Sequence, residues 1–277
     1  MKQTSIGFIG GGNMACSLIG GLIADGYHPS AIRVADPDEE QRQLVASSYG
    51  VQATASNHDV LAASDIIVLA VKPQVIRNVA SEIGSAVCDK SCLVISIAAG
   101  VSVEHLSKWL DNGIAIVRAM PNIAVLVKCG ATALYANPQV TDDQRSQAES
   151  IMRAVGLTLW LDDESSMDAV TALSGSGPAY LFLVIEVLEN AAIKLGLSLE
   201  TAHLLALQTA FGAAKMALES SEDCKTLRAR VTSPGGTTEQ AVKVLQHGDI
   251  QGLFDQALEA AHHRAAELSE LLGKSDG

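Results

Sequence analysis

A glycine-rich turn near the start of the chain constrains the fold more than any other stretch. Residues 6–9 form a short apolar run that predicts a buried β-strand, and Gly10, Gly12 and Ala15 follow it with the spacing G-x-G-x-x-A. Gly10 permits a tight turn, Gly12 leaves room for a diphosphate, and Ala15 lets the next helix pack closely on the strand. The unpaired N–H groups at the start of that helix attract an anion. The pattern predicts a dinucleotide site, with a plain strand-to-helix connection as the alternative.

An acidic residue at the expected distance supports this prediction. Asp36 follows a second strand candidate at residues 32–35. A carboxylate at that point accepts hydrogen bonds from the adenosine ribose and repels a 2′-phosphate, so Asp36 favours NAD(H). Arg33 and Arg42 lie close by in the sequence and could bind a phosphate instead, although solvated surface positions are the more ordinary state for both.

Composition and charge limit the class of protein. The 277 residues are 48% hydrophobic, which suffices for about two globular domains. The net charge is −12 and the sequence has no run of basic residues, so nucleic acid and anionic membranes are poor partners. Glycine or charge interrupts each apolar run before the ~20 residues that span a bilayer, and the N-terminus lacks a long apolar segment with a cleavage site. We therefore expect a cytoplasmic protein.

The cysteines and histidines show no metal-binding pattern. The five cysteines are an odd number without C-x-x-C spacing, which is typical of reduced thiols and argues against a disulfide framework or a zinc site. His262 and His263 are adjacent on a predicted helix, so they point to different sides of it. We expect no metal and interpret the two histidines as a surface pair.

Helix and strand signals alternate through the first half of the chain, as a parallel sheet with crossover helices requires. The strand candidates are residues 6–9, 32–35, 51–54, 66–71, 93–97, 114–117, 131–135 and 157–161. Residues 39–49 predict a helix that stops at Gly50, a residue typical of helix C-caps. The continuous apolar run at 66–71 suits a central strand that is covered on both faces. Small, proline or polar residues follow three strands, at 72–73, 98–100 and 118–122. Because ligands bind at the carboxyl ends of such strands, we expect these segments to line the site.

Lys72 is the candidate for proton transfer at that edge, because an amine beside a nicotinamide could act as an acid. The sequence shows no sign of the burial that would make this amine a proton donor at neutral pH. We therefore interpret Lys72 as a cofactor contact or a solvated charge, with a catalytic role as the less favoured alternative.

The strand signals end near residue 162, and the later signals are helical. The helix candidates are residues 178–194, 198–219, 223–231, 237–246 and 250–272. This change predicts a sheet domain at residues 1–162 and an all-α domain at residues 163–277. Small and apolar residues cover most of the helix at 199–218, which is more than a single core contact requires. We favour a helix buried in a dimer over the central helix of a monomeric bundle.

Two segments of the helical domain differ from simple linkers. Residues 174–178, Ser-Gly-Ser-Gly-Pro, predict a small flexible turn before a helix that begins at Pro178. Residues 232–238, Thr-Ser-Pro-Gly-Gly-Thr-Thr, predict a turn that leads into the N-terminus of another helix. The successive N–H groups and hydroxyls of this second turn predict a carboxylate-binding site.

Taken together, these motifs resemble those of the pyrroline-5-carboxylate reductases over essentially the full chain. The motifs are Phe-Ile-Gly-Gly-Gly-Asn-Met at 8–14, Ala-Val-Lys-Pro at 70–73, Ser-Ile-Ala-Ala-Gly at 96–100, Arg-Ala-Met-Pro-Asn at 118–122, Leu-Ser-Gly-Ser-Gly-Pro-Ala-Tyr at 173–180 and Val-Thr-Ser-Pro-Gly-Gly-Thr-Thr at 231–238. The resemblance implies an α/β Rossmann-type N-terminal domain and an all-α C-terminal dimerisation domain, exchanged in an interlocked homodimer that is sometimes assembled into a decamer. It also implies reduction of 1-pyrroline-5-carboxylate to L-proline by NADPH or NADH, the last step of proline biosynthesis.

The resemblance also implies roles for individual residues. The expected cofactor contacts are Gly10, Gly11, Gly12, Asn13, Met14, Asp36, Asn57, Ala70, Val71, Lys72, Pro73, Ala98 and Ala99. The expected substrate contacts are Met120, Asn122, Ser176, Ser233, Gly235, Gly236, Thr237 and Thr238. Backbone N–H groups of the turn at 233–238 would bind the substrate carboxylate, and the hydroxyl of Thr238, the expected catalytic residue, would meet the ring nitrogen. Many relatives that prefer NADPH carry Ser or Thr in place of Asp36, and some carry Glu in place of Ser221.

These residue types suit a reaction that depends on positioning. A protonated cyclic imine is already an electrophile, so the site has to hold it, bind its carboxylate and exclude water without a strong acid. Two other functions are alternatives. One is a Rossmann-type 3-hydroxyacid dehydrogenase. Such enzymes resemble one another in carrying a Lys in the first helix of the second domain, and residues 178–189 of this chain contain no Lys. A non-catalytic NAD(H)-sensing dimer would not need the turn at 232–238.

Overall fold

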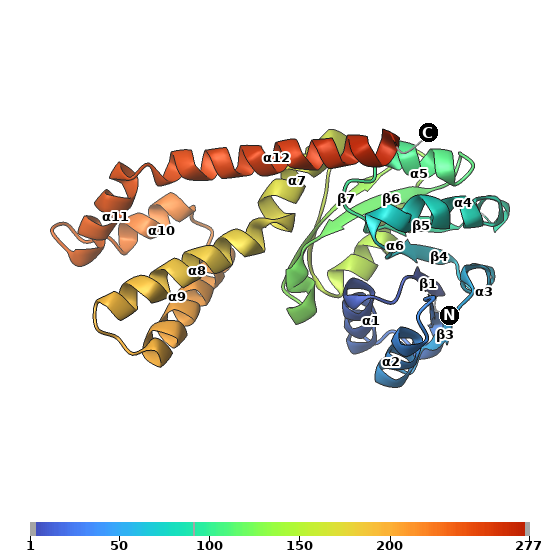
Figure 1. Ribbon diagram of the computed structural model, residues 1–277, viewed down its shortest axis with the longest axis horizontal. Helices are drawn as coiled ribbons and strands as arrows, with labels where there is room; N and C mark the ends of the chain where they lie inside the picture. The colour runs from blue at the N-terminus through green and yellow to red at the C-terminus, as the bar shows by residue number, and fades with distance from the viewer. Residues whose placement is uncertain (1–3, 91, 275–277) are drawn as a thin grey trace. The chain divides into compact units, whose positions relative to one another are not determined.

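The computed structural model of the protein describes residues 4–90 and 92–274, which include an eight-stranded sheet (Figure 1). The strands are β1 (Ile6–Ile9), β2 (Ile32–Ala35), β3 (Gln52–Thr54), β4 (Ile66–Leu69), β5 (Leu93–Ser96), β6 (Ile116–Pro121), β7 (Gly130–Ala136) and β8 (Gly156–Trp160). Their spatial order is β3-β2-β1-β4-β5-β6-β7-β8. All neighbouring strands are parallel except β6 and β7. The predicted α/β class of the first half of the chain is confirmed.

The direction in which the chain adds strands reverses between β1 and β4. From β1 the chain moves outward through β2 and β3, and it then returns to β4 and moves outward in the other direction. The crevice outside the carboxyl ends of the strands at such a reversal is where doubly wound sheets bind ligands. Gly10 follows β1 at this point, and Ala70 follows β4 with its N–H donating to Ile9 O at 2.8 Å. The topology therefore places the glycine-rich turn at the expected binding edge.

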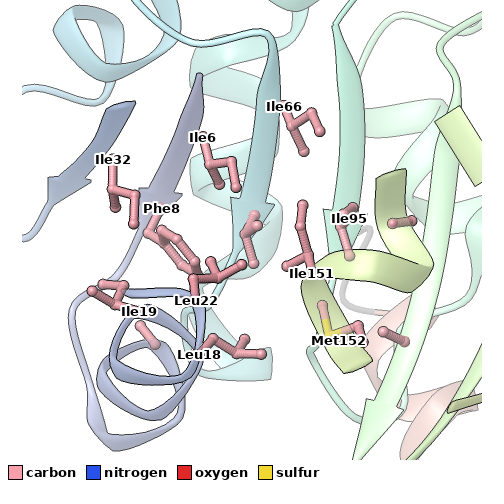
Figure 2. Packing of buried hydrophobic residues seen from close by; sticks show 14 of the residues in the cluster. Ile6, Phe8, Leu18, Ile19, Leu22, Ile32, Ile66, Ile95, Ile151 and Met152 are labelled. Carbon is pink, nitrogen blue, oxygen red and sulfur yellow. The ribbon is translucent and has the colours of Figure 1, made fainter. Parts of the chain in front are cut away.

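Helices cover both faces of the sheet. One face is covered by α1 (Asn13–Ala24), α2 (Glu39–Tyr49) and α6 (Asp142–Arg153), and the other by α3 (Asn57–Ala62), α4 (Pro73–Lys90) and α5 (Val103–Trp109). Figure 2 shows Leu22 of α1 beside Phe8 of β1, and Ile151 of α6 near Ile95 of β5, within the buried cluster of the first face. Phe8, Leu18 and Ile19 have no exposed surface, and burial of such side chains contributes about 1.5–3 kcal/mol each.

Polar residues set the starts of several of these helices. The side chains of Asp38, Ser56 and Ser102 accept hydrogen bonds from backbone N–H groups in the first turns of α2, α3 and α5. Thr141 and Gln144 cap the start of α6 reciprocally. Each such cap satisfies N–H groups that have no partner within the helix. The caps explain why α2 spans the same residues as the sequence pattern predicts, ending at Tyr49 with Gly50, φ +69°, as its C-cap.

Helices make up the chain after β8. They are η3 (Glu164–Ser166), α7 (Met167–Val170), η4 (Thr171–Gly175), α8 (Gly177–Lys194), α9 (Leu199–Glu219), α10 (Cys224–Arg230), α11 (Thr237–His247) and α12 (Ile250–Lys274). The contacts divide the chain into two compact units. The first unit holds the residues up to Ser176 and from Ala261 onward, and the second holds Gly177–Ala260.

The limits of the compact units differ from the predicted limit at residue 162. The segment from 163 to 176 belongs with the sheet, because Glu164 pairs with Arg118 of β6 at 2.8 Å and Ser174 accepts a hydrogen bond from Asn122 at 3.2 Å. The change from strand to helix signals therefore comes before the division between the two units. The predicted boundary at residue 162 between two separately folding domains therefore stays a prediction.

The sheet departs from the predicted parallel pattern at β7. This strand is antiparallel to β6, with Met120 opposite Ala133. Only residues 122–129, which include η2 (Ile123–Val127), connect the two strands, and a parallel crossover needs a dozen residues or more. Pairing with β7 also extends β6 through Arg118, Met120 and Pro121, so the predicted strand end at Val117 was wrong.

The predicted flexible turn at residues 174–178 is helical. Residues Thr171–Gly175 form one π-helical turn, η4, and α8 follows from Gly177. The N–H of Ser176 donates to Thr171 O at 2.9 Å, which is the wide hydrogen-bond spacing of a π turn. Gly175 allows close packing here, because a Cβ on it would lie 2.7 Å from Cε of Met120.

One helical run differs from the expectation that glycine or charge breaks every long apolar stretch. By length and composition alone, Glu164–Lys194 could cross a membrane. Only 6% of its most apolar part is buried within the chain. The run therefore carries an exposed apolar surface, for which a function is proposed below.

Candidate functional site

Gly10 turns the chain at the end of β1. Its φ is +96°, a conformation that residues with side chains rarely adopt, and its N–H donates to Ala35 O at 2.8 Å. A Cβ on Gly10 would lie 2.6 Å from Ala70 O. Both the backbone conformation and the space between β2 and β4 therefore require glycine at this position.

Gly12 leaves the start of α1 open. It is the N-cap residue of that helix, and a Cβ on it would meet no described atom within 4 Å. Asn13 and Met14 begin the helix, while Ala15 is fully buried against the strands. Because the first N–H groups of a helix lack intrahelical partners and the helix dipole is positive there, this turn fits a diphosphate.

Asp36 braces the glycine-rich turn. Its Oδ2 accepts a hydrogen bond from Gly11 N at 2.8 Å, and its Oδ1 accepts one from Asp38 N at 2.9 Å. The carboxylate thus lies beside the turn, where a ribose-binding group is expected. The hydrogen bond to Gly11 is a second role that the sequence pattern does not reveal, because it depends on the packing of β1 against β2.

The two arginines near Asp36 differ in position. Arg42 Nη1 donates to Asp36 O at 2.9 Å and to Pro37 O at 2.8 Å. Arg33 Nη1 donates to Ala63 O at 3.4 Å, at the end of α3. Arg42 is therefore the arginine that lies at the Asp36 loop, while Arg33 is directed to another helix.

The thiol of Cys16 is hydrogen-bonded to the glycine-rich turn. Cys16 Sγ donates to Gly11 O at 3.3 Å, and Gln41 Nε2 also bonds this carbonyl. Burial raises the pKa of the Cys16 thiol above its ordinary value, with a hydrogen bond to Tyr49 opposing that rise and the charge of Asp36 adding to it. The thiol is therefore neutral at pH 7, and it supports the turn through hydrogen bonding.

The remaining predicted cofactor contacts follow the carboxyl ends of the neighbouring strands. Ala70, Val71, Lys72 and Pro73 follow β4, and α4 begins at Pro73. Lys72 is exposed, which agrees with a contact or a solvated charge and offers no burial to support proton transfer.

Ala98 and Ala99 follow β5, where Ala98 is buried and Ala99 is exposed. Asn57 is the first residue of α3, after β3, and its Nδ2 donates to Glu82 Oε2 at 3.0 Å. Asn57 therefore shares the binding edge of the sheet with the alanines, while its side chain is directed to α4.

Met120 and Asn122 lie at the end of β6 and contact the segment before α8. The Oδ1 atom of Asn122 accepts hydrogen bonds from Ala124 N at 3.2 Å and Ala131 N at 3.3 Å, and its Nδ2 donates to Ser174 Oγ at 3.2 Å. Asn122 thus holds three segments together in this structure. Ser176 directly follows the bonded segment and is half-buried.

A buried ion pair beneath this region was missed at the sequence level. Arg118 Nη1 lies 2.8 Å from Glu164 Oε1, and the Arg118 side chain is 5% exposed. The sequence shows an arginine directly after the strand candidate at 114–117, among apolar residues. It does not show that the partner is Glu164, which lies 46 residues away.

The predicted carboxylate-binding turn precedes α11 in the second unit. Gly235 has φ +73° and donates its N–H to Glu239 Oε2 at 2.8 Å, while Gly236 donates to Ser233 O at 3.0 Å. In this conformation two of the N–H groups expected to bind the carboxylate, those of Gly235 and Gly236, are therefore bonded within the turn and its helix. The N–H groups of Thr237 and Thr238 occupy the first two helical positions, which have no partner within the helix.

Glu239 is held in place at this turn. The hydrogen bond from Gly235 N is the main cause that lowers the pKa of its carboxyl below the ordinary value, and Lys243 lowers it further. Lys243 Nζ lies 3.1 Å from Glu239 Oε1. Thr238 itself is half-buried and Thr237 is exposed, so the turn presents one sheltered hydroxyl and one open one.

Two family models match separate parts of the chain. Residues 164–268 match the family model described as pyrroline-5-carboxylate reductase dimerisation. Residues 5–100 match the model described as NADP oxidoreductase coenzyme F420-dependent. The first match covers the helical part of the chain, and the second covers the glycine-rich turn and Asp36.

Full-length relatives agree with these matches. The chain is 49% identical to the pyrroline-5-carboxylate reductase of Pseudomonas aeruginosa over 99% of this chain and 100% of the relative. A solved pyrroline-5-carboxylate reductase from Coxiella burnetii has a TM-score of 0.94 and 49% identity over 96% of this chain and 99% of that one. The Plasmodium falciparum pyrroline carboxylate reductase, solved with NADP bound, has a TM-score of 0.85 and 29% identity over 97% and 99%. The chain belongs to the pyrroline-5-carboxylate reductase family.

Proposed function

We propose that the protein reduces 1-pyrroline-5-carboxylate to L-proline with NAD(P)H, the last step of proline biosynthesis. The observation that carries the proposal is the open start of α1 at Gly12 in a chain whose full length is similar to pyrroline-5-carboxylate reductases. The turn before α11 supports it, because two unpaired N–H groups and the Thr238 hydroxyl suit a small carboxylate with a ring nitrogen.

The chain's own residues would act mainly by positioning. Gly10 to Met14 and Asp36 would hold the dinucleotide, and Ala98 and Ala99 would border its nicotinamide. The bound cofactor supplies the hydride. The N–H groups of Thr237 and Thr238 would hold the substrate carboxylate, and the Thr238 hydroxyl would bond the ring nitrogen. Holding an electrophilic imine in place and excluding water lowers the barrier without a strong acid.

An assay of the purified protein tests this function. Oxidation of NADH and of NADPH is followed by absorbance with and without 1-pyrroline-5-carboxylate, and L-proline is identified as the product. Substrate-dependent oxidation with stoichiometric proline supports the proposal. Cofactor binding without turnover would favour the non-catalytic alternative, and turnover of a 3-hydroxyacid would favour the dehydrogenase.

The proposed cofactor preference is for NADH over NADPH. Asp36 supports it, because its carboxylate lies beside Gly11 and would repel a 2′-phosphate. The replacement Asp36→Asn should raise the kcat/KM for NADPH relative to NADH by about tenfold or more, since a like-charge pair about 4 Å apart costs roughly 1 kcal/mol in water and about 4 kcal/mol near a protein surface. Asparagine keeps an oxygen that can accept the Gly11 hydrogen bond.

The matched control is Asp38→Asn, which removes the same charge two residues away at the N-cap of α2. This variant should leave the ratio of the two kcat/KM values within about twofold of wild type. An equal change in both variants, or none in Asp36→Asn, would show that Asp36 does not face the ribose.

The Thr238 hydroxyl is expected to matter for the substrate alone. Thr238→Ala should lower the kcat/KM for pyrroline-5-carboxylate by roughly 10-fold to 100-fold, because a hydrogen bond to a charged group contributes about 1.5–3 kcal/mol. Thr238→Val should behave like Ala, and Thr238→Ser should keep most activity. Cofactor affinity, measured by fluorescence titration, should be unchanged in all three. A fully active Val variant would mean that the side chain only fills space.

We further infer that the protein is a homodimer. The decamer that the resemblance implies would be assembled from such dimers. An apolar groove of about 480 Å³ in the second unit supports the dimer. The groove is lined by Tyr180, Leu183, Val184, Val187, Leu188, Leu245, Ile250, Leu253, Phe254 and Ala257. A second copy of this surface would cover it, in keeping with the dimerisation description of the matching family model. Burial against a second copy also accounts for the apolar surface of α8 without a membrane. The five free cysteines support a cytoplasmic enzyme.

A further inference from the structure

Three residues of β6 and its continuation contact one later segment of the chain. Arg118, Met120 and Asn122 are two residues apart, so their side chains lie on the same side of an extended strand. Arg118 pairs with Glu164, Met120 packs against Gly175, and Asn122 bonds Ser174. The segment from 164 to 175 therefore lies along β6, with the ion pair at one end and the hydrogen bond at the other.

Glu164 also reaches a third segment. Its Oε1 accepts a hydrogen bond from Val103 N at 2.8 Å as well as from Arg118 Nη1 at 2.8 Å. Val103 is the first residue of α5, so its N–H has no partner within the helix. One carboxylate oxygen thus joins β6, the start of α5 and the start of η3.

The pair is largely removed from water. The Arg118 side chain is 5% exposed and the Glu164 side chain is 22% exposed. Taking two charges out of water costs free energy that their attraction offsets only with good geometry, so buried pairs contribute little net stability. Breaking such a pair by removing one partner is costly, because the other charge stays buried and unpaired. The pair is therefore better suited to fixing one arrangement of its neighbours than to stabilising the fold.

Each joined segment leads to residues of the proposed site. The loop before α5 carries Ala98 and Ala99, the end of β6 carries Met120 and Asn122, and the segment after Glu164 runs to Ser176. All of these residues belong to the first compact unit. A shift of the ion pair would displace the expected nicotinamide side and the expected substrate side of the site together.

We propose that Arg118 and Glu164 are positioning residues for the reduction, which set the loop at 98–101 and the segment at 174–176 against the end of β6. The proposal rests on the proposed function. Neither residue touches the reacting atoms in this role. Their contribution is to the geometry in which the substrate meets the cofactor, where a misplacement of about 1 Å can cost about 100-fold in rate.

Four variants separate positioning from stability. Glu164→Gln and Arg118→Met each leave one partner unpaired, the double variant Arg118→Met/Glu164→Gln leaves no buried charge, and Glu164→Asp keeps the charge but shortens its reach by one methylene. The matched control is Glu104→Gln on α5, which removes an exposed carboxylate that pairs with Lys108 four residues along the same helix. For each protein we would measure Tm, the Kd for the reduced cofactor, and kcat and KM for pyrroline-5-carboxylate.

The expected result is a separation of Tm from kcat. The single variants should lose both, and the double variant should recover most of the Tm because no unpaired charge remains. Its kcat should nevertheless stay about 100-fold below wild type, with a smaller change in KM, since the lost geometry acts in the transition state. Glu164→Asp should keep the wild-type Tm and lose about tenfold in kcat. Glu104→Gln should keep the wild-type Tm and stay within about twofold of wild type in Kd, kcat and KM.

The outcomes distinguish this proposal from the function on which it rests. Absence of pyrroline-5-carboxylate reduction in wild type and Glu104→Gln alike would contradict the proposed function. In active enzyme, recovery of kcat together with Tm in the double variant would show that the pair is only structural and would overturn the positioning role. A kcat of Glu164→Asp equal to that of Glu104→Gln would overturn it as well, even if the other variants fail to fold.

Discussion

Replacing Gly12 by valine is expected to abolish dinucleotide binding while the protein stays folded. A Cβ at Gly12 would meet no described atom within 4 Å, so we expect the fold to survive the replacement. The same side chain would fill the space at the start of α1 in which a diphosphate must approach the backbone. Loss of two charge-assisted hydrogen bonds costs about 3–6 kcal/mol, roughly 100-fold to 10,000-fold in Kd.

Calorimetric titration with NADH and NADPH measures this loss, and thermal unfolding reports whether the fold survives. Gly12→Ala should have an intermediate Kd, because one methyl group fills less of the space. Ser17→Ala, one turn further along α1, serves as the control and should bind like wild type. Cofactor affinity of Gly12→Val near the wild-type value would refute the assignment of the turn to the dinucleotide.

The largest expected loss of stability comes from Gly156→Ala at the start of β8. Gly156 has φ +150°, and a Cβ there would lie 2.0 Å from Gly130 O and 2.6 Å from Gly130 N. These are backbone atoms of the paired strand β7, so the strands would have to separate. We expect a loss of about 3 kcal/mol or more and a fall in Tm of roughly 10 °C.

Gly113→Ala is the matched control for this effect. Gly113 also has a positive φ, +76°, but a Cβ there would meet no described atom within 4 Å. Its replacement should cost only the conformational strain, about 1 kcal/mol. Thermal and urea unfolding of both variants gives the comparison. Equal losses in the two proteins would mean that backbone conformation, rather than the contact with β7, decides the effect.

Local patterns predicted much of the fold, including the glycine-rich turn of the candidate cofactor site. The apolar run before Gly10, the spacing to Ala15 and the position of Asp36 predicted the strand, turn and helix that the structure shows. The helix at 39–49 has the predicted limits because its start and end depend on neighbouring residues, Asp38 and Gly50. Such features are local, since capping, periodicity and positive φ act within a few residues.

Features that depend on long-range contacts needed the tertiary structure. The direction of β7 depended on whether residues 122–129 could form a crossover, and their number allows only the antiparallel return. The partner of Arg118 and the Glu239 carboxylate at Gly235 N could not be read from residue types, because many charged residues could have filled either role.

The sequence by itself determined the glycine-rich turn after β1, the limits of α2 and the family, but it misplaced the end of β6. Only the tertiary structure decided which residues are bonded to each other, such as Asp36 to Gly11 and Asn122 to Ser174. The physical reason is that backbone propensity is set over a few neighbours, whereas hydrogen bonds and ion pairs between distant segments form only once the segments have packed.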